Sequence, residues 1–441
     1  MSSSSRKVGE FPTPTVLEKT AAQGVRAAAR AAGVAFVVNA VFGGAQVAHC
    51  ANWDFNPRIE VGGLYNDNYR LAQDAPDQVH AGGALLDASV GMRLLTQRSE
   101  ISIVPKVTSN YFPDDTRDDS TNGYLDLKAN TRTLKAAYGV TVQYANEEVI
   151  FSELLPGTFP GVELGQIVGS QSGRVNVLNR RELESVVPTM SYDFSPRYHL
   201  NLDADYLHAA YAKNLFEESG FQNFQVQAGL SYDISQQSTL TGRFIGSRYE
   251  PNGGIEPTNG YGAQAELAFH PTQIIRYYFR LGALRSQAQI NGGSVANTSL
   301  TGGAGITWTY RITQLVLDGL QGVAPSAAGA VQNHTEVRFR VIRALRPRLS
   351  GFVGARAIRL RGTVGGAFAI QGSDYAAATT GLEYQLTRSY RLAGEYDYTW
   401  QRFQNEPHAA SNAFTLSVIY QPLSRYQPLP ELNGLPVGAP Q

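Results

Sequence analysis

The stretch from 53 to 63, WDFNPRIEVGG, alternates apolar and polar side chains with a period of two residues. Trp53 and Phe55 stand at odd positions, whereas Arg58 and Glu60 stand at even positions. Successive side chains of a β-strand point to opposite faces. The period therefore predicts a strand with one face in an apolar medium and the other in a polar medium.

The same alternation returns along the chain beyond residue 50, in pairs of segments joined by short turns. One pair covers 186–194 and 200–206, with the turn SPRY between its two halves. Similar pairs flank SQQS, PTQI, RITQ, LRPR and TRSY, at a spacing of roughly 35 to 41 residues. Tight turns between alternating segments predict β-hairpins, so the chain is expected to be an array of hairpins.

Long polar segments such as FPDDTRDDSTNG and EPNGGIEPTNG separate these hairpins. Short turns at one edge of a sheet and long loops at the other are typical of bacterial outer-membrane barrels. One opening strand, eight hairpins and a closing strand give about 18 strands, with 16 as the alternative count. We therefore predict an all-β fold, a transmembrane antiparallel up-and-down barrel with short periplasmic turns and long extracellular loops.

Aromatic side chains stand at both ends of the apolar faces, and Leu, Val, Ala, Ile and Gly fill the middles. Those next to the short turns include Phe194, Tyr232, Phe269, Tyr384 and Tyr420, and those toward the long loops include Tyr111, Tyr144 and Trp400. Amphipathic rings prefer membrane interfaces, whereas a soluble sandwich, the alternative fold, would gather them in mid-core. The two belts predict lipid outside the barrel, water inside it and a location in the outer membrane.

The N-terminal segment predicts export. Arg26 and Arg30 precede AAGVAFVVNAVFGG, which has the length of a signal-peptide apolar region. We expect residues 1–50 to be a signal peptide with a long n-region, 51–420 to form the barrel, and 421–441 to be a proline-rich periplasmic tail. Cys50 is the only cysteine, so no intrachain disulfide is expected.

Charge and the closing strand indicate the partners. The formal net charge is zero and the sequence pI is about 7.1, which gives no sign of a nucleic-acid partner. Phe414, Leu416, Val418 and Tyr420 alternate in a segment that resembles the assembly signal of outer-membrane proteins. The expected partners are the lipid bilayer with its lipopolysaccharide, the outer-membrane assembly machinery, and a polysaccharide or small solute.

Three segments carry a family resemblance: PRIEVGGLYNDNYRL, LDASVGMRLLTQRSEISIVPKVTSNYF and the SPRYHLNLDADY type of hairpin. They resemble the outer-membrane β-barrel porins often found beside exopolysaccharide-synthesis genes, over nearly all of the mature chain. That family has a Tyr-Asp-Asp-Asn-like motif at the end of its first strand, where this chain has Tyr65, Asn66, Asp67 and Asn68. The resemblance implies a transport role associated with polysaccharide export and no defined catalytic site.

One cluster of residues is a candidate for an enzymatic site. His199, Asp203 and Asp205 share one strand face, and His208 lies just beyond on the other, so an acid–base pair or a metal site is the alternative to ordinary water-facing residues. No serine nucleophile, paired-carboxylate motif or His-x-x-x-His spacing accompanies them. We therefore predict no catalytic site, no bound metal and no cofactor.

Charged residues at lumen-facing positions are the main functional candidates. The basic ones are Arg276, Arg280, Arg338, Arg340 and Arg356, and the acidic ones are Asp203, Asp205, Asp233, Glu395 and Asp397. Opposed walls of unlike charge would create a transverse field across a pore. The alternative is that these groups pair with one another and only stabilise the wall.

The longest loop, within 145–179, is also apolar. Its side chains Phe151, Leu154, Leu155 and Phe159 seldom stay exposed, so they either fold into the lumen as a constriction or dock on a partner. Two functions remain open: a porin-like channel for saccharides or exopolysaccharide, and a non-conducting structural or assembly barrel whose loops bind a partner.

The asymmetry of turns and loops predicts the orientation in the membrane. Tags inserted at Asp118 and Asn252 are expected to be reached by antibody on intact cells, because these residues lie in long loops. Tags at Pro196 and Pro347 lie in short turns and are expected to be labelled only after the outer membrane is opened. The reverse pattern of labelling would rule out this orientation.

Overall fold

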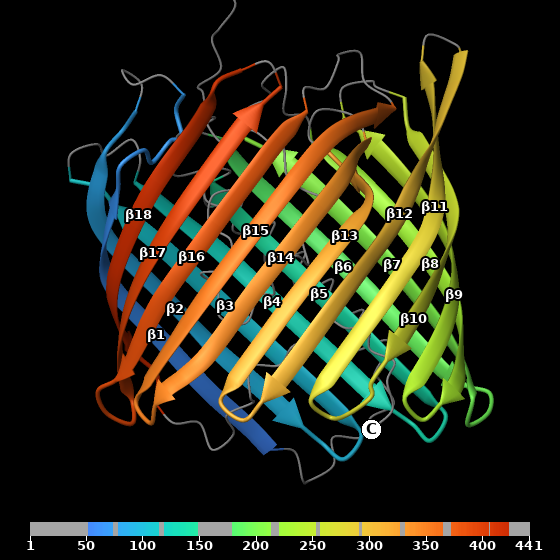
Figure 1. The fold of residues 1–441 in the computed structure, drawn as a ribbon, viewed down its shortest axis with the longest axis horizontal. Coiled ribbons are helices and arrows are strands. Elements are labelled where there is room, and N and C mark those ends of the chain that lie inside the picture. Colours follow the sequence, from blue (N-terminus) through green and yellow to red (C-terminus); the bar gives the residue numbers. More distant parts are fainter. Residues whose placement is uncertain are drawn as a thin grey trace, which may run out of the picture. The chain divides into compact units, whose positions relative to one another are not determined.

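Eighteen antiparallel strands form one closed sheet in the computed structural model, in which β1 pairs with both β2 and β18. The structure describes residues 52–73, 78–113, 119–148, 179–212, 220–252, 256–290, 293–326, 331–364, 372–404 and 406–422. The predicted barrel and its predicted strand number are confirmed (Figure 1). The predicted signal peptide, the apolar loop residues and nearly all of the tail lie outside the described residues.

The strands follow one another around the barrel in chain order, each paired with its sequence neighbours. They are β1 Asn52–Asn66, β2 Ala81–Leu95, β3 Ser99–Tyr111, β4 Ser120–Arg132, β5 Ala136–Glu148, β6 Arg180–Asp193, β7 Tyr198–Tyr211, β8 Phe221–Ser235, β9 Ser238–Pro251, β10 Thr258–Phe269, β11 Ile275–Ile290, β12 Gly293–Tyr310, β13 Thr313–Pro325, β14 Val331–Arg346, β15 Leu349–Val364, β16 Ser373–Gln385, β17 Tyr390–Phe403 and β18 His408–Tyr420. No helix in the described part of the chain is long and apolar enough to cross a membrane.

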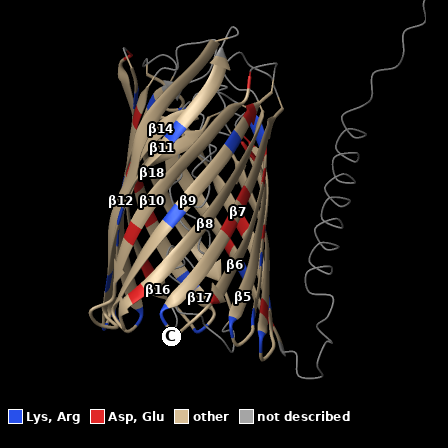
Figure 2. Cartoon of the chain, turned by 90° about the vertical axis from the view of Figure 1, so that its right-hand side faces the viewer, with Lys and Arg blue, Asp and Glu red and all other residues tan. Residues whose placement is uncertain are grey.

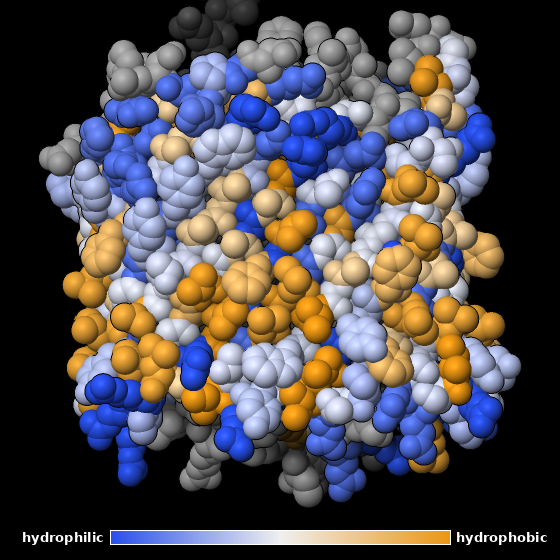
Figure 3. Space-filling view, viewed as in Figure 1, coloured by the Kyte–Doolittle hydropathy of each residue, from blue (hydrophilic) through white to orange (hydrophobic). Residues whose placement is uncertain are grey.

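The outward face of the sheet is apolar, as the alternation predicts. On β18 the outward residues Phe414, Leu416 and Val418 are 52%, 50% and 44% exposed, while inward Ser417 and Ile419 are buried. Figure 3 shows the apolar side chains as a zone around the lower middle of the barrel, with hydrophilic bands at both ends. Such exposure of apolar side chains suits contact with lipid, and a closed antiparallel barrel of this kind is a bacterial outer-membrane architecture. The protein is therefore an outer-membrane protein.

Aromatic rings of adjacent strands lie in contact near the short turns. The ring centroids of Tyr198 and Tyr232 are 4.9 Å apart, and those of Tyr390 and Tyr420 are 5.2 Å apart. The ring centroids of Phe269 on β10 and Tyr277 on β11 are 5.0 Å apart. Paired rings at one level give a continuous amphipathic surface at the membrane boundary.

The sheet departs from regularity at the long-loop end between β12 and β13. These strands pair only from Gly302 with Gln321 to Tyr310 with Thr313. Beyond that point β12 continues to Gly293 beside β11 alone, and β13 continues to Pro325 beside β14 alone. Figure 1 shows the β11–β12 hairpin rising on its own at the upper right. β15 also contacts β11 and β12, although β13 and β14 lie between them in the strand order. The outer end of the β13–β14 hairpin has therefore left the cylindrical wall.

The outward orientation of Leu416 predicts a cost for placing charge there. Leu416→Arg is expected to lower the free energy of unfolding by about 2 to 4 kcal/mol, because the guanidinium would face hydrocarbon. Thr415→Arg is the matched control, since Thr415 faces inward and is only half-buried. Ser417 is unsuitable as a control because its hydroxyl donates to Glu60 Oε1 at 2.6 Å. Urea titration in lipid vesicles measures the difference, and equal losses in both variants would contradict the assignment of faces.

Candidate functional site: the barrel lumen

Charged residues of both signs occur at many levels of the barrel wall, as the coloured segments of the strands in Figure 2 show. One network joins β9, β10 and β11. Glu266 on β10 lies 2.5 Å from the guanidinium of Arg280 and 3.4 Å from that of Arg243. Glu266 is 5% exposed, so the two arginines neutralise a carboxylate that water hardly reaches.

A second network crosses β11 to β15. Tyr278 on β11 donates its hydroxyl to Asp318 on β13, and Arg338 Nη2 lies 2.6 Å from the same carboxylate. Glu336 is 1% exposed and binds Arg356 at 2.7 Å, with Arg338 Nε at 3.7 Å. The chain of contacts therefore alternates negative and positive groups across β13, β14 and β15, and the Tyr278 hydroxyl extends it to β11.

A glycine makes this second network possible. Tyr278 reaches Asp318 by passing over β12, which lies between their strands. A Cβ on Gly305 would stand 2.5 Å from the Tyr278 ring and 2.9 Å from Asp318 Oδ2. Sequence reasoning did not include Asp318 among the lumen residues, although its even position in TQLVLDG gives it the inward parity.

A third network lies on β1 to β3. Asp87 binds Lys106 at 2.7 Å and lies 3.8 Å from Arg58, whose Nη2 is 2.6 Å from Glu60. These side chains are at most 14% exposed. Each charge in this part of the wall thus has an opposite charge within ion-pair distance.

The predicted basic residues divide into two groups. Arg280, Arg338 and Arg356 belong to the networks above, whereas Arg276 and Arg340 are exposed to the lumen and make no ion pair within the described residues. Pairing, one of the two alternatives considered from the sequence, therefore occurs for three of the five arginines. Neutralised arginines stabilise the wall, and the two unpaired ones leave positive charge facing the water.

The predicted acidic residues also differ from one another. Asp233 contacts His199 Nε2 at 3.0 Å and accepts a hydrogen bond from Thr239 at 2.7 Å. Asp397 accepts a hydrogen bond from Thr379, and Glu395 lies two residues away on the same inward face of β17. Asp203 and Asp205 face inward on β7 and have no ion-pair partner among the described residues.

The histidines considered as an acid–base or metal cluster lie on opposite faces of β7. His199 faces inward between Asp193 and Asp233, at 2.7 and 3.0 Å, and His208 has the outward parity. No group of three or more His, Cys, Asp or Glu side chains suited to a metal ion occurs in the described ranges. The contacts of His199 are those of a wall residue paired with carboxylates.

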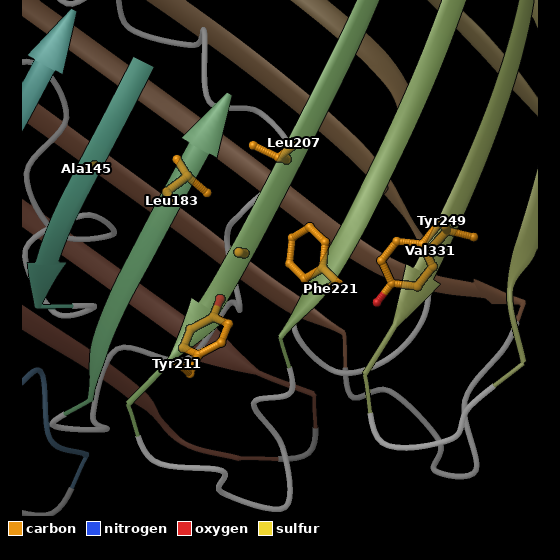
Figure 4. Close-up of a cluster of buried hydrophobic side chains, with 8 residues drawn as sticks. Ala145, Leu183, Leu207, Tyr211, Phe221, Tyr249 and Val331 are labelled. Atoms are coloured by element: carbon orange, nitrogen blue, oxygen red, sulfur yellow. The ribbon is translucent and has the colours of Figure 1, made fainter. Parts of the chain in front are cut away.

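Near the long-loop end the lumen contains an apolar contact between opposite walls (Figure 4). The buried members are Ala145, Leu183, Leu207, Ala209, Tyr211, Phe221, Tyr249 and Val331. All except Val331 come from β5 to β9, whereas Val331 opens β14. Tyr249 is 1% exposed and donates its hydroxyl to the backbone oxygen of Ser326, just after β13, at 2.6 Å. The outer end of the β13–β14 hairpin therefore lies across the lumen against the β5–β9 wall, and we call this contact the outer bridge.

Sequence reasoning did not find the outer bridge. The predicted constriction, with docking on a partner as its alternative, concerned Phe151, Leu154, Leu155 and Phe159, which lie outside the described residues. A signal was present, because Leu207, Tyr211 and Phe221 are apolar residues at the inward parity of water-facing strands. Val331, the member from β14, had no such signal. Alternation along one strand does not show which distant strands of a barrel come into contact.

A second apolar contact narrows the same mouth. Tyr69 and Leu71 of the β1–β2 loop pack against Ala81, Phe112 and Ala409, all with buried side chains. The Tyr69 and Phe112 rings lie 4.7 Å apart. Asn68 anchors the loop by donating to the backbone oxygens of Ala72 and Ala410, each at 2.9 Å.

Comparisons with known proteins concern the architecture. No protein-family model and no curated protein matches the chain. OccK2 (OpdF) of Pseudomonas aeruginosa, solved in complex with glucuronate, is 12% identical, with 84% of this chain and 99% of that chain covered and a TM-score of 0.44. The outer membrane protein OpdK of the same organism is 11% identical, with 84% and 99% covered and a TM-score of 0.43. The FrpB iron transporter from Neisseria meningitidis is 6% identical, with 83% and 81% covered and a TM-score of 0.40.

The charge networks predict a stability effect. Arg356→Met is expected to lower the free energy of unfolding by about 3 to 5 kcal/mol, because it leaves the buried Glu336 with only the longer contacts to His334 Nε2 at 3.4 Å and Arg338 Nε at 3.7 Å. Changing both Arg356 and Glu336 to Met should restore much of the loss. Arg343→Met, at an exposed outward position of β14, is the control and should change the free energy by less than about 1 kcal/mol. Guanidinium titration followed by tryptophan fluorescence measures all three.

Proposed function

We propose that this protein is a porin-like channel of the outer membrane that passes small solutes. The observation that carries the proposal is a closed barrel of 18 strands whose inward faces are lined by charged groups. Barrels of this size are wide enough to leave an aqueous channel inside the wall. Charged side chains facing the lumen are also the groups by which such channels select their solutes.

Saccharides are the solute class that we favour, including segments of exopolysaccharide as the sequence resemblance implies. Arg276 and Arg340 would offer planar guanidinium groups to the carboxylates of acidic sugars, since neither forms an ion pair with a carboxylate of the described wall. Neutral sugar rings would stack on Tyr278, whose ring stands 5.5 Å from the guanidinium carbon of Arg280. We assign the protein no chemical reaction.

A non-conducting structural barrel is the second candidate, and the outer bridge favours it. The contact of Tyr249 with Ser326 and the packing of Val331 close part of the lumen near its outer mouth. Single-channel recording in planar bilayers separates the two functions. Discrete, salt-dependent openings are expected for a channel, and a folded protein that inserts without openings would support the structural role.

The unpaired arginines predict the ion selectivity. Arg340→Glu is expected to shift the reversal potential in a potassium chloride gradient toward cation selectivity, because it reverses an exposed charge inside the lumen. Arg343→Glu makes the same charge change on the outward face of the same strand and should leave the potential unchanged. Equal shifts in both variants would mean that Arg340 does not act on the permeating ions.

A further inference from the structure

Four charged side chains gather on the outward face of the barrel at its long-loop end. Arg359 on β15 is paired in register with Asp374 on β16, and Asp374 is paired in register with Arg402 on β17. Arg361 stands two residues beyond Arg359 on the same face. The sheet therefore places three guanidinium groups around one carboxylate, on a surface that a lumen-based function does not use. We call these four residues the arginine cluster.

The cluster carries more positive charge than its carboxylate neutralises. The shortest nitrogen–oxygen distances to Asp374 are 2.9 Å from Arg359, 3.1 Å from Arg361 and 3.2 Å from Arg402. The three arginine side chains are 63%, 42% and 53% exposed, whereas Asp374 is 13% exposed. Three positive charges and one negative charge leave a net charge of +2. Each guanidinium group has five donors and one carboxylate accepts few, so Asp374 cannot use most of them. Arg361 Nη1 donates instead to the backbone oxygens of Leu360 and Ser373, at 2.8 and 3.3 Å.

A cavity of about 280 Å³ adjoins the cluster. It is lined by Arg361, Gly372, Asp374, Arg402, Gln404 and Glu406. A Cβ on Gly372 would stand 2.8 Å from Arg361 Nη1, so this glycine leaves room for the guanidinium beside the cavity. Glu406 accepts a hydrogen bond from Gln73 at 2.9 Å. When the negative charge of Glu406 is added to that of the arginine cluster, the net charge around the cavity is still +1.

The depth of the cluster matches the phosphate level of the outer leaflet. Trp400, an aromatic residue of the outer belt, stands two residues before Arg402 on β17, and the Arg402 guanidinium carbon lies 5.8 Å from the Trp400 ring centroid. Belt aromatics mark the edge of the hydrocarbon. Two residues along a tilted strand rise roughly 5 Å along the membrane normal. Figure 3 shows a hydrophilic band at the long-loop end of the barrel, above the apolar zone.

We propose that the arginine cluster binds a phosphate group of lipopolysaccharide from the outer leaflet. A phosphomonoester presents several charged oxygens, which guanidinium groups bind in bidentate fashion. The acyl chains of the same molecule would lie on the zone below, against outward residues such as Tyr398 and Val353, which are 38% and 48% exposed. One ligand thus satisfies both the surplus charge and the apolar surface beneath it.

An arginine–glutamate ion pair at the same end of the barrel, away from the arginine cluster, provides the comparison. Arg248 on β9 also faces outward, but Glu250 lies 2.5 Å from its Nε and neutralises it one to one. Its side chain is 57% exposed, which is similar to Arg402. Arg248→Gln therefore removes an exposed outward arginine without touching the arginine cluster.

The test uses the purified, folded barrel in detergent and native mass spectrometry with lipid A that carries both phosphates. Changing Arg359 and Arg402 together to Gln is expected to weaken binding by about tenfold or more, since two sets of charge-assisted hydrogen bonds are lost. Arg248→Gln should bind as the unchanged protein does. Equal binding by all three proteins would overturn the proposal.

Two further arms identify the ligand. Dephosphorylated lipid A is expected to bind at least about tenfold more weakly, and binding equal to that of the phosphorylated form would show that acyl chains alone are recognised. Inorganic phosphate should not compete at millimolar concentration, and full competition would mean a site for free phosphate. If the glutamine variant does not fold, Asp374→Asn decides the matter: it removes the neutralising carboxylate, so tighter binding is expected, and unchanged or weaker binding would refute the site.

Discussion

Hydrocarbon offers no hydrogen-bond partner to a peptide group, and this constraint determines the rest of the structure. A sheet that crosses a bilayer must pair every strand on both sides, so it has to close on itself. Here closure is made by β1 and β18, from Ile59 with Tyr420 to Asn66 with Ala413. Once the sheet is closed, every strand has one face in lipid and one in the lumen. The two-residue alternation of the sequence follows directly from that geometry.

The same geometry concentrates charge inside. Inward residues such as Glu266, Glu336 and Asp87 stand on a curved wall where neighbouring side chains converge, and all three are buried. An unpaired carboxylate in such a place is costly, so each is matched by arginine or lysine on a flanking strand. Among the arginines named above, the two without an ion-pair partner in the described wall, Arg276 and Arg340, have side chains that are exposed to the lumen. These two arginines are therefore the basic groups of the wall that water and a solute can reach.

Alternation was sufficient to predict the barrel and its strand number, because these depend only on local periodicity. It could not predict which inward charges pair, since that depends on register between strands: Asp318 was missed, although it binds Tyr278 across β12 and Arg338 beside it. The arginine cluster was missed for the same reason. Arg359, Asp374 and Arg402 are far apart in the sequence, and only the pairing of β15, β16 and β17 aligns them.

The pairing of β12 with β13 determines where the outer bridge can form at the mouth of the barrel. Because β12 and β13 stop pairing at Gly302 and Gln321, the outer end of β13–β14 is freed from one neighbour and can lie across the lumen. Its new partners are apolar inward residues such as Phe221 and Tyr249, and the hydrogen bond from the Tyr249 hydroxyl to the Ser326 backbone oxygen is buried. Unpaired charged residues would not hold a hairpin in this way, because their carboxylates and guanidiniums would have to be stripped of water. The apolar residues at inward positions of β5 to β9 are therefore explained by the hairpin that covers them, and the charged residues beside them on β5 and β6, Glu147 and Arg181, are buried as an ion pair with a nitrogen–oxygen distance of 2.5 Å.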